Sequence, residues 1–281
     1  MKLWYDTVMK IAYNMLWMSP TFPVPGQAHA APIPERIRSN ILHVAEMNDG
    51  ADVLLWTDPA RFTAQQMAEF KSIEREAEHK NIHVRSLRDI AQYRSVKDPK
   101  GNLFFDQPND APRSDKNSIF WRQVDVARIM ATQESAREGY GQVFYADADI
   151  TNLNVKAYEV EQVMQKHGAL FCSGWVKGSP IENGLFALTQ QHAPLLEPLL
   201  KDTLAAALVA EVNGFNTLHE WAKDVVMPAV GHPDPQALCF TPHFLMGKPV
   251  TVAYDKKKKN GNSSDWVDSL PRDGHSGWRG A

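Results

Sequence analysis

The sequence has little cysteine, no long apolar run and no large excess of either charge. The two cysteines, Cys172 and Cys239, and the lack of any Cys-x-x-Cys or Cys/His ligand spacing argue against a disulfide scaffold or zinc finger. No apolar stretch approaches the roughly 20 residues that span a bilayer, and Tyr5, Asp6 and Asn14 interrupt the pattern of a signal peptide. A net charge of −3 gives no support for nucleic-acid or anionic-membrane partners. We expect a soluble protein made in a reducing cytoplasm.

What the sequence does have is enough apolar material for one large core. Of its 281 residues, 43% are hydrophobic and 22% are charged, which is the balance of a globular chain. We find no internal repeat and no convincing linker. The sequence therefore predicts a single domain over residues 1–281, in which residues 255–281, polar and rich in glycine, form a flexible C-terminal lid or tail.

Apolar runs alternate with amphipathic segments along the first third of the chain. Residues 11–18, 52–57 and 82–87 are typical of buried strands. Between them, a helix is expected from Pro34 to residue 48, and a second over residues 64–80 with Thr63 as its N-cap. This β-α-β-α-β order predicts the α/β class, with a mostly parallel central sheet flanked by helices.

The rest of the chain continues the same pattern. Residues 97–115, rich in Asp, Pro, Asn and Lys, are predicted to form an exposed excursion. The expected elements that follow are a long helix over 117–138, strands over 142–145, 169–175, 184–189 and 250–254, and helices over 192–211 and 215–226.

The strongest local motif is FYADADI, residues 144–150. An apolar strand here delivers Asp147 and Asp149, at spacing i and i+2, to the carboxyl end of a parallel sheet, where open α/β folds bind ligands. Carboxylates suit Mn²⁺ or Mg²⁺, and such ions complete their coordination with phosphate oxygens. The motif predicts a divalent-metal site that holds a phosphate-bearing ligand.

A second candidate lies in the long helix before that strand. Asp125 and Arg128, at i and i+3, share one helix face near the same strand end. They form either a local salt bridge or a pair in which Asp125 accepts sugar hydroxyls and Arg128 faces the phosphates. Arg122, one turn earlier, is a competing phosphate contact.

Three further places carry candidate residues. Glu182, in the polar segment 179–184, is either part of a plain turn or a carboxylate that acts as base or orients the acceptor. Trp17, at the end of the first strand, is either core or a platform that stacks on a base. The tail segment 260–266 is either a disordered end or a lid, in which Asn262 and Ser264 add metal ligands and Trp266 covers the sugar-phosphate.

With these motifs together, the chain resembles the DxD-type glycosyltransferase toxins and effectors, which have the GT-A fold. FYADADI, the Glu182-Asn183 pair in IENGLFALTQQHAPLLEPLL, FTAQQMAEFKSIEREAEHKNIHV and the NSSDW tail resemble the NleB/SseK branch, which transfers N-acetylglucosamine to arginine. Asp125-x-x-Arg128 and the Ser264-x-Trp266 spacing resemble the second branch, the clostridial-type glucosylating toxin domains. At the position of Ile181 the first branch has a histidine.

The resemblance implies a role for each candidate. Asp149, Asn262 and Ser264 would bind Mn²⁺ or Mg²⁺, Asp147 would contact the donor and Glu182 would be the catalytic carboxylate. Trp17, Arg122, Asp125, Arg128, Asn183 and Trp266 would bind the UDP-sugar donor.

Three functions stay open on this basis. The first is transfer of a sugar, expected to be N-acetylglucosamine, from a UDP-sugar to a protein, with arginine as the expected acceptor. The others are glucosyl transfer to a Ser, Thr or Tyr hydroxyl or a cell-envelope glycan, and a non-catalytic nucleotide-sugar-binding module. The motifs fit a bacterial effector or toxin, made in the bacterial cytoplasm, and leave open its secretion into host cells.

Overall fold

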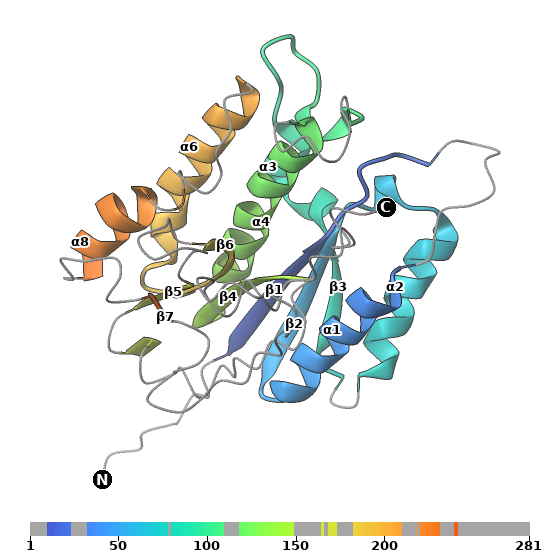
Figure 1. The fold of residues 1–281 in the computed structure, drawn as a ribbon, viewed down its shortest axis with the longest axis horizontal. Coiled ribbons are helices and arrows are strands. Elements are labelled where there is room, and N and C mark those ends of the chain that lie inside the picture. The colour runs from blue at the N-terminus through green and yellow to red at the C-terminus, as the bar shows by residue number, and fades with distance from the viewer. Residues whose placement is uncertain are drawn as a thin grey trace, which may run out of the picture.

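The computed structural model describes residues 10–23, 33–77, 80–109, 118–148, 164–165, 168–172, 182–209, 218, 220–230 and 239–240. Within this part of the chain, a seven-stranded sheet runs in the order β3-β2-β1-β4-β6-β5-β7 (Figure 1). The strands are β1 (Ile11–Trp17), β2 (Ala51–Thr57), β3 (Ile82–Ser86), β4 (Gln142–Asp147), β5 (Ala169–Cys172), β6 (Glu182–Thr189) and β7 (Cys239–Phe240).

Helices cover both faces of this sheet. The α-helices are α1 (Glu35–Met47), α2 (Ala64–Glu76), α3 (Ala91–Ser95), α4 (Ile119–Arg137), α6 (Leu196–Leu208) and α8 (Met227–Val230). Short 3-10 turns occupy Pro59–Arg61, Leu87–Asp89, Phe104–Asp106 and Ala193–Leu195, and a π-helical segment occupies Ala222–Val226.

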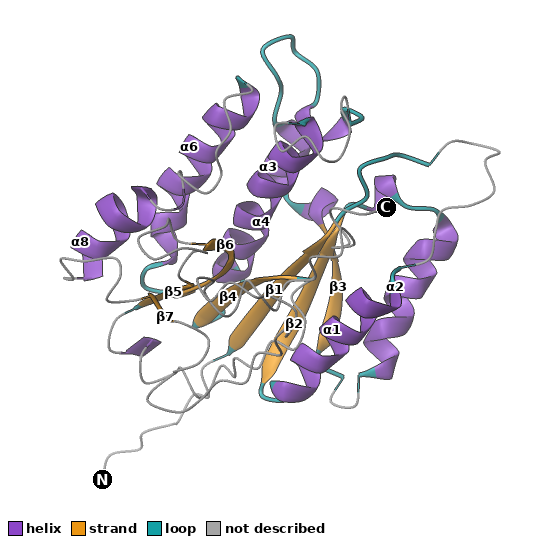
Figure 2. Ribbon diagram, in the orientation of Figure 1, coloured by secondary structure: helices purple, strands orange, loops and turns teal. Residues whose placement is uncertain are grey.

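Strand direction explains where the helices lie. β3, β2, β1 and β4 are parallel, β6 is antiparallel to both β4 and β5, and β7 is parallel to β5. Crossovers between parallel strands are right-handed, so α1 and α2, which lead outward from β1 to β3, lie on one face. The return to β4 reverses direction, so α4 packs on the opposite face with α6 (Figures 1 and 2). The α/β class and the mostly parallel sheet are confirmed.

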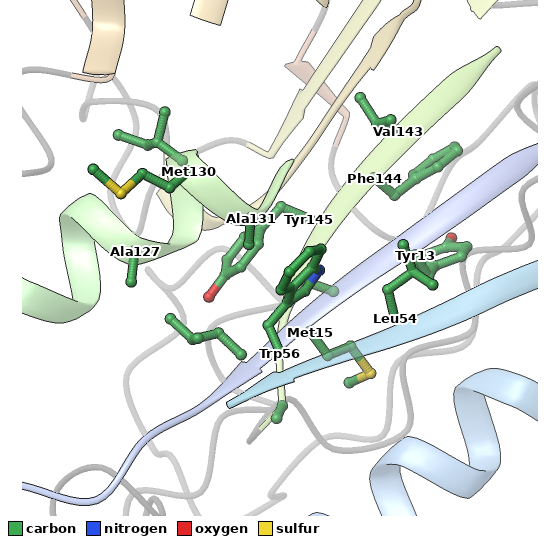
Figure 3. Packing of buried hydrophobic residues seen from close by; sticks show 14 of the residues in the cluster. Tyr13, Met15, Leu54, Trp56, Ala127, Met130, Ala131, Val143, Phe144 and Tyr145 are labelled. Atoms are coloured by element: carbon green, nitrogen blue, oxygen red, sulfur yellow. The ribbon is translucent and has the colours of Figure 1, made fainter. Parts of the chain in front are cut away.

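The core lies between the sheet and these two helical layers. β1, β2 and β4 are buried along almost their whole length, as strands covered on both faces must be. Side chains alternate across the sheet: Tyr13 stacks on Phe144 with ring centroids 4.6 Å apart, whereas Tyr145 lies on the face toward α4 (Figure 3). This alternation sends Tyr145 and Asp147 to the same face.

The predicted boundaries hold for most of the described elements. Thr63 caps α2 as expected, and its hydroxyl and the side chain of Gln66 form a reciprocal capping box. The helix ends at Glu76, however, four residues before the predicted end at residue 80, because Ala77 adopts an extended conformation.

The predicted exposed excursion over residues 97–115 was wrong in part. Phe104 and Phe105 are buried, and the ring of Phe105 stacks on Tyr93 at 3.7 Å. Burial of two consecutive aromatic side chains removes a large apolar area from water, and this stabilises the packing of the turn against the core. Residues 110–117 lie outside the described part.

The second half of the sheet differs from prediction at its edges. β6 begins at Glu182, two residues before the predicted strand, so Glu182 and Asn183 belong to the strand and not to a turn. β5 is described to Cys172, and the strand predicted over 250–254 lies outside the described residues. No helix in the described part is both long and apolar enough to cross a bilayer.

Candidate active site

The strand order reverses between β1 and β4, because β2 and β3 extend the sheet to one side of β1 and β4 begins the other side. In open α/β sheets, ligands bind outside the carboxyl ends of the strands at such a reversal. Here that edge carries Trp17 at the end of β1 and Asp147 at the end of β4, and Asp147 is in register with Leu16. β6 runs antiparallel to β4, so the start of β6 at Glu182 reaches the same edge. The topology thus brings three candidates from distant parts of the sequence to one edge.

Arg128 links the long helix to this edge. Its Nη2 lies 3.2 Å from Oδ1 of Asp125, the local salt bridge expected at i and i+3. Its Nη1 lies 3.7 Å from Oδ1 of Asp147 in the metal-type motif. The structure therefore joins two candidates that the sequence kept separate, with a mostly buried guanidinium between two carboxylates.

Tyr145 completes this cluster, and sequence reasoning missed it. Its hydroxyl donates a hydrogen bond of 2.7 Å to Oδ1 of Asp147, and its ring lies 5.4 Å from the guanidinium carbon of Arg128. The sequence could have indicated this contact, because side chains two residues apart in a strand point to the same face, as Tyr145 and Asp147 do. We refer below to Asp125, Arg128, Tyr145 and Asp147 as the carboxylate cluster.

The ionisation of Asp125 in the carboxylate cluster is disfavoured by its surroundings. Burial raises the pKa of Asp125 above its ordinary value of 3.8, Arg128 opposes that shift, and the nearby charge of Asp147 adds to it. Arg128 thus offsets the burial of Asp125 only in part. Such arrangements are more common at functional sites than in a core selected for stability alone.

Asp125 and Arg128 also line a small pocket. Its other walls come from α4, β6, α6 and the segment before the π-helix: Ile129, Phe186, Leu199, Thr203 and Leu218. The pocket has a volume of about 10 Å³, which is room for about one water molecule, so it is too small in this form to hold a sugar or a nucleotide.

Arg122 lies apart from the carboxylate cluster in its contacts. It is buried, and its Nη1 donates a hydrogen bond of 2.6 Å to the carbonyl of Ala207 near the C-terminal end of α6. Cationic groups at helix C-termini satisfy free carbonyls and complement the helix dipole. This contact favours a structural role, and its predicted contact with phosphate stays a prediction.

Trp17 is buried, with 6% of its surface exposed. This value favours core packing in the chain without ligand. The role as a platform for a base stays a prediction.

A buried ionic network supports the same edge, and no sequence motif pointed to it. Asp58, directly after β2, accepts a two-pronged pair of hydrogen bonds from Arg88 at 2.7 and 2.9 Å, and one from the hydroxyl of Tyr93 at 2.9 Å. Arg61 donates to the carbonyls of Ser19 at 3.0 Å and Phe105 at 2.7 Å. Because Ser19 follows β1 by two residues, this network fixes the chain next to Trp17.

Burial sets the protonation behaviour of this network. Burial lowers the pKa of Arg61, although the nearby charge of Asp58 acts to raise it. Burial also raises the pKa of Tyr93 well above its ordinary value. Arg61 is also within 4.5 Å of the ring centre of Phe22. Arg61 and Arg88 both form ion pairs with Asp58, at 3.4 and 2.7 Å, so the buried charges are partnered.

Several predicted site residues lie outside the described part. These are Asp149, Asn262, Ser264 and Trp266, together with the side chains of Glu182 and Asn183. Within the described residues, no three side chains of the types that bind metals lie close enough to share an ion. Of the Asp147-Ala148-Asp149 motif, the described part includes Asp147, whose carboxylate is of the kind that Mn²⁺ or Mg²⁺ prefers.

No protein-family model matches the chain, and no curated protein matches it in sequence. Among solved structures, PaToxG glycosyltransferase is similar at 12% identity, with 80% of each chain covered and a TM-score of 0.47. The bacterial N-acetylglucosamine transferase NleB is similar at 14% identity, over 80% of this chain and 86% of that chain, with a TM-score of 0.41.

The solved structure of a synthase is also similar to the chain. It is 4-diphosphocytidyl-2C-methyl-D-erythritol synthase from Anaerococcus prevotii, at 9% identity over 70% of this chain and 76% of that chain, with a TM-score of 0.38. These likenesses are too low to transfer an activity from any of the three proteins.

Proposed function

We propose that the chain is a metal-dependent glycosyltransferase of the GT-A type that takes a sugar from a UDP-sugar donor. The observation that carries this proposal is the position of Arg128, between the carboxylates of Asp125 and Asp147 at the reversal of strand order. A cation and sugar-binding oxygens at one sheet edge match the two halves of a sugar-diphosphate ligand. The expected sugar is N-acetylglucosamine, and the expected acceptor is an arginine of a protein.

The described residues divide the work on the donor. Arg128 would face the diphosphate and stabilise the negative charge that develops as the sugar leaves. Asp125 would accept hydrogen bonds from sugar hydroxyls, and the hydroxyl of Tyr145 would hold Asp147 in place. These roles use groups already ordered by α4 and β4, so binding requires little rearrangement.

The remaining groups complete the reaction. A divalent cation, Mn²⁺ or Mg²⁺, held by Asp147 and Asp149 together with Asn262 and Ser264, would offset the charge of the diphosphate. Glu182, whose backbone lies at the same sheet edge, would orient or deprotonate the acceptor. The guanidinium of an arginine acceptor has a very high pKa, so a carboxylate beside it is chemically sensible.

A second candidate function is glucosyl transfer to a Ser, Thr or Tyr hydroxyl. The observation that favours it is the joint arrangement of Asp125 and Arg128 with Asp147, since that helix pair resembles the glucosylating toxin domains. The product separates the two functions, because the mass added and the linkage atom differ between them.

The test is donor hydrolysis by the purified chain, with UDP-N-acetylglucosamine and UDP-glucose in separate reactions, each with Mn²⁺ or a chelator. We expect UDP release that requires the metal and prefers one donor. UDP binding without release from either donor would contradict both proposed donors, and would favour another donor sugar or the non-catalytic module.

A further inference from the structure

Asn40 is a polar residue within the apolar stripe of α1. The helix buries Ile37, Asn40, Ile41, Val44 and Ala45, and these positions repeat at the spacing of one helix face. Asn has a lower helix propensity than the residues that usually fill such a stripe, and burial of its amide is unfavourable without a partner. A buried asparagine here therefore needs a hydrogen bond that explains it.

The partner of Asn40 is at the candidate active site. Its Nδ2 donates a hydrogen bond of 3.1 Å to the carbonyl of Ala148, which lies 108 positions further along the sequence. Ala148 is fully buried and stands between the two aspartates of the metal-type motif. The bond thus connects α1 to the turn that follows β4.

The hydrogen bond from Asn40 matters because Ala148 lies just beyond the paired part of β4. The register of β4 with β1 ends at Asp147, so Ala148 is the first residue past the paired segment. A peptide bond is planar, and a hydrogen bond to its carbonyl fixes the orientation of the whole unit. The unit that carries the carbonyl of Ala148 is the one through which the chain continues to Asp149.

The motif is held from both faces of the sheet. Arg128 and Tyr145 contact the side chain of Asp147 on the face covered by α4. Asn40 belongs to α1, which covers the opposite face (Figure 1), and holds the next residue by its backbone. We propose that Asn40 is a positioning residue, which fixes the chain directly after Asp147 for metal binding without touching metal or donor.

This inference rests on the proposed function, since it gives Asn40 a task at the proposed metal site. It differs from a general packing role in one respect. Residues that orient metal ligands change metal affinity when they are replaced, typically by about 10–100-fold. A residue that only packs α1 changes stability instead.

Asn81 provides a matched control within the same chain. It is also a buried asparagine, and its Nδ2 donates to the carbonyls of Ala45, Asn48 and Ala51 at 2.9–3.1 Å. These contacts lie at the amino end of β2, the edge opposite to the candidate active site. The two asparagines thus make the same kind of bond at the two ends of the sheet.

The experiment measures Mn²⁺ affinity in the presence of UDP, from the electron paramagnetic resonance signal of free Mn²⁺, for the native chain, Asn40→Leu and Asn81→Leu. We expect Asn40→Leu to weaken Mn²⁺ binding by about tenfold or more, and Asn81→Leu to leave it unchanged while lowering the free energy of unfolding. Asn40→Ala tests the same bond if the leucine variant does not fold.

Two results would overturn the inference. One is native Mn²⁺ affinity in the Asn40 variants, and the other is an equal loss in the Asn40 and Asn81 variants, which would indicate general destabilisation. A native chain that binds no Mn²⁺ with UDP would instead contradict the proposed metal dependence itself.

Discussion

Arg128 and Asp125 show, at the scale of single residues, a compromise between the cost of burying a carboxylate and the gain from its ion pair. Ionised Asp125 loses hydration on burial, and the arginine 3.2 Å away recovers only part of that loss, so its pKa is raised. The nearby charge of Asp147 increases the effect. A neutral side chain at this position would avoid that loss, so the stability of Asp125 variants measures what the carboxylate costs the fold.

Replacement of Asp125 by asparagine tests this compromise. The folded chain holds the Asp125 proton more tightly than the unfolded chain, so this group lowers stability as pH rises from about 3.8 through the raised folded pKa. Asp125→Asn, which has no proton to lose, is therefore expected to be more stable than the native chain at neutral pH. The difference should vanish in acid, and donor turnover should be lost.

Urea denaturation at a series of pH values, with donor hydrolysis beside it, measures both effects. An Asp125→Asn variant that is less stable than the native chain at neutral pH would show that the salt bridge with Arg128 outweighs burial. Retained turnover would remove Asp125 from the site.

The hydroxyl of Tyr145 gives a second prediction at this scale. Tyr145→Phe keeps the ring against Arg128 and removes the hydrogen bond to Asp147. We expect a stability loss of about 1 kcal/mol and a clear fall in kcat/KM for the donor, because Asp147 loses the group that orients it.

Tyr140 is the control for Tyr145. Its hydroxyl also donates to an aspartate, Asp52, at 2.7 Å, but at the opposite edge of the sheet. Tyr140→Phe should cost similar stability and leave kcat/KM unchanged. Equal kinetic losses in both variants would argue against a specific role for Tyr145.

At the scale of secondary-structure elements, the buried network around Arg61 joins parts that the β-α-β pattern leaves unconnected. Arg61 follows β2 and donates to the carbonyl of Ser19 after β1, to that of Phe105, and to Gln123 in α4 at 2.7 Å. Three other segments thus accept hydrogen bonds from one guanidinium beside the candidate active site. Its role is to fix the carboxyl ends of β1 and β2 relative to α4.

Arg61→Met should destabilise the fold strongly. Removal of one partner from a buried ionic network costs about 3–5 kcal/mol, although Asp58 keeps its bonds to Arg88 and Tyr93. Arg75→Met, at an exposed position of α2, should change the free energy of unfolding by less than about 0.5 kcal/mol. Chemical denaturation compares the two, and equal losses would contradict the network's role.

The elements themselves were largely predictable from the sequence. β1, β2, β3 and β4 are short apolar runs between amphipathic segments, and burial on both faces requires that pattern. The position of β6 between β4 and β5 was not predictable, since strand pairing across the sheet depends on contacts far apart in sequence. The buried turn at Phe104 and Phe105 was missed because its polar neighbours outnumber its two aromatic residues.

At the scale of the whole molecule, the sequence predicted several residues of the candidate site but not the contacts between them. Asp147, Asp125 and Arg128 were recognised from their local spacing, and the structure brings them together. Asn40 was not recognised, because a single asparagine in an apolar helix face carries no signal until its partner is known. The single domain, the lid and the roles of Asp149, Asn262, Ser264 and Trp266 stay predictions.

The central claim is that the carboxylate cluster binds the donor of a glycosyltransferase. Its most direct test is Mn²⁺-dependent UDP release by the native chain, Arg128→Met and Arg137→Met. Arg137 is the matched control, because it lies on the same helix, is half exposed, and pairs only with Glu134 and Glu197 among the described residues.

We predict that Arg128→Met lowers UDP release by about a hundredfold or more, whereas Arg137→Met retains native activity, with both variants folded by circular dichroism. Full activity in a folded Arg128→Met variant would contradict the account, since the proposed site would then have lost its cation without consequence.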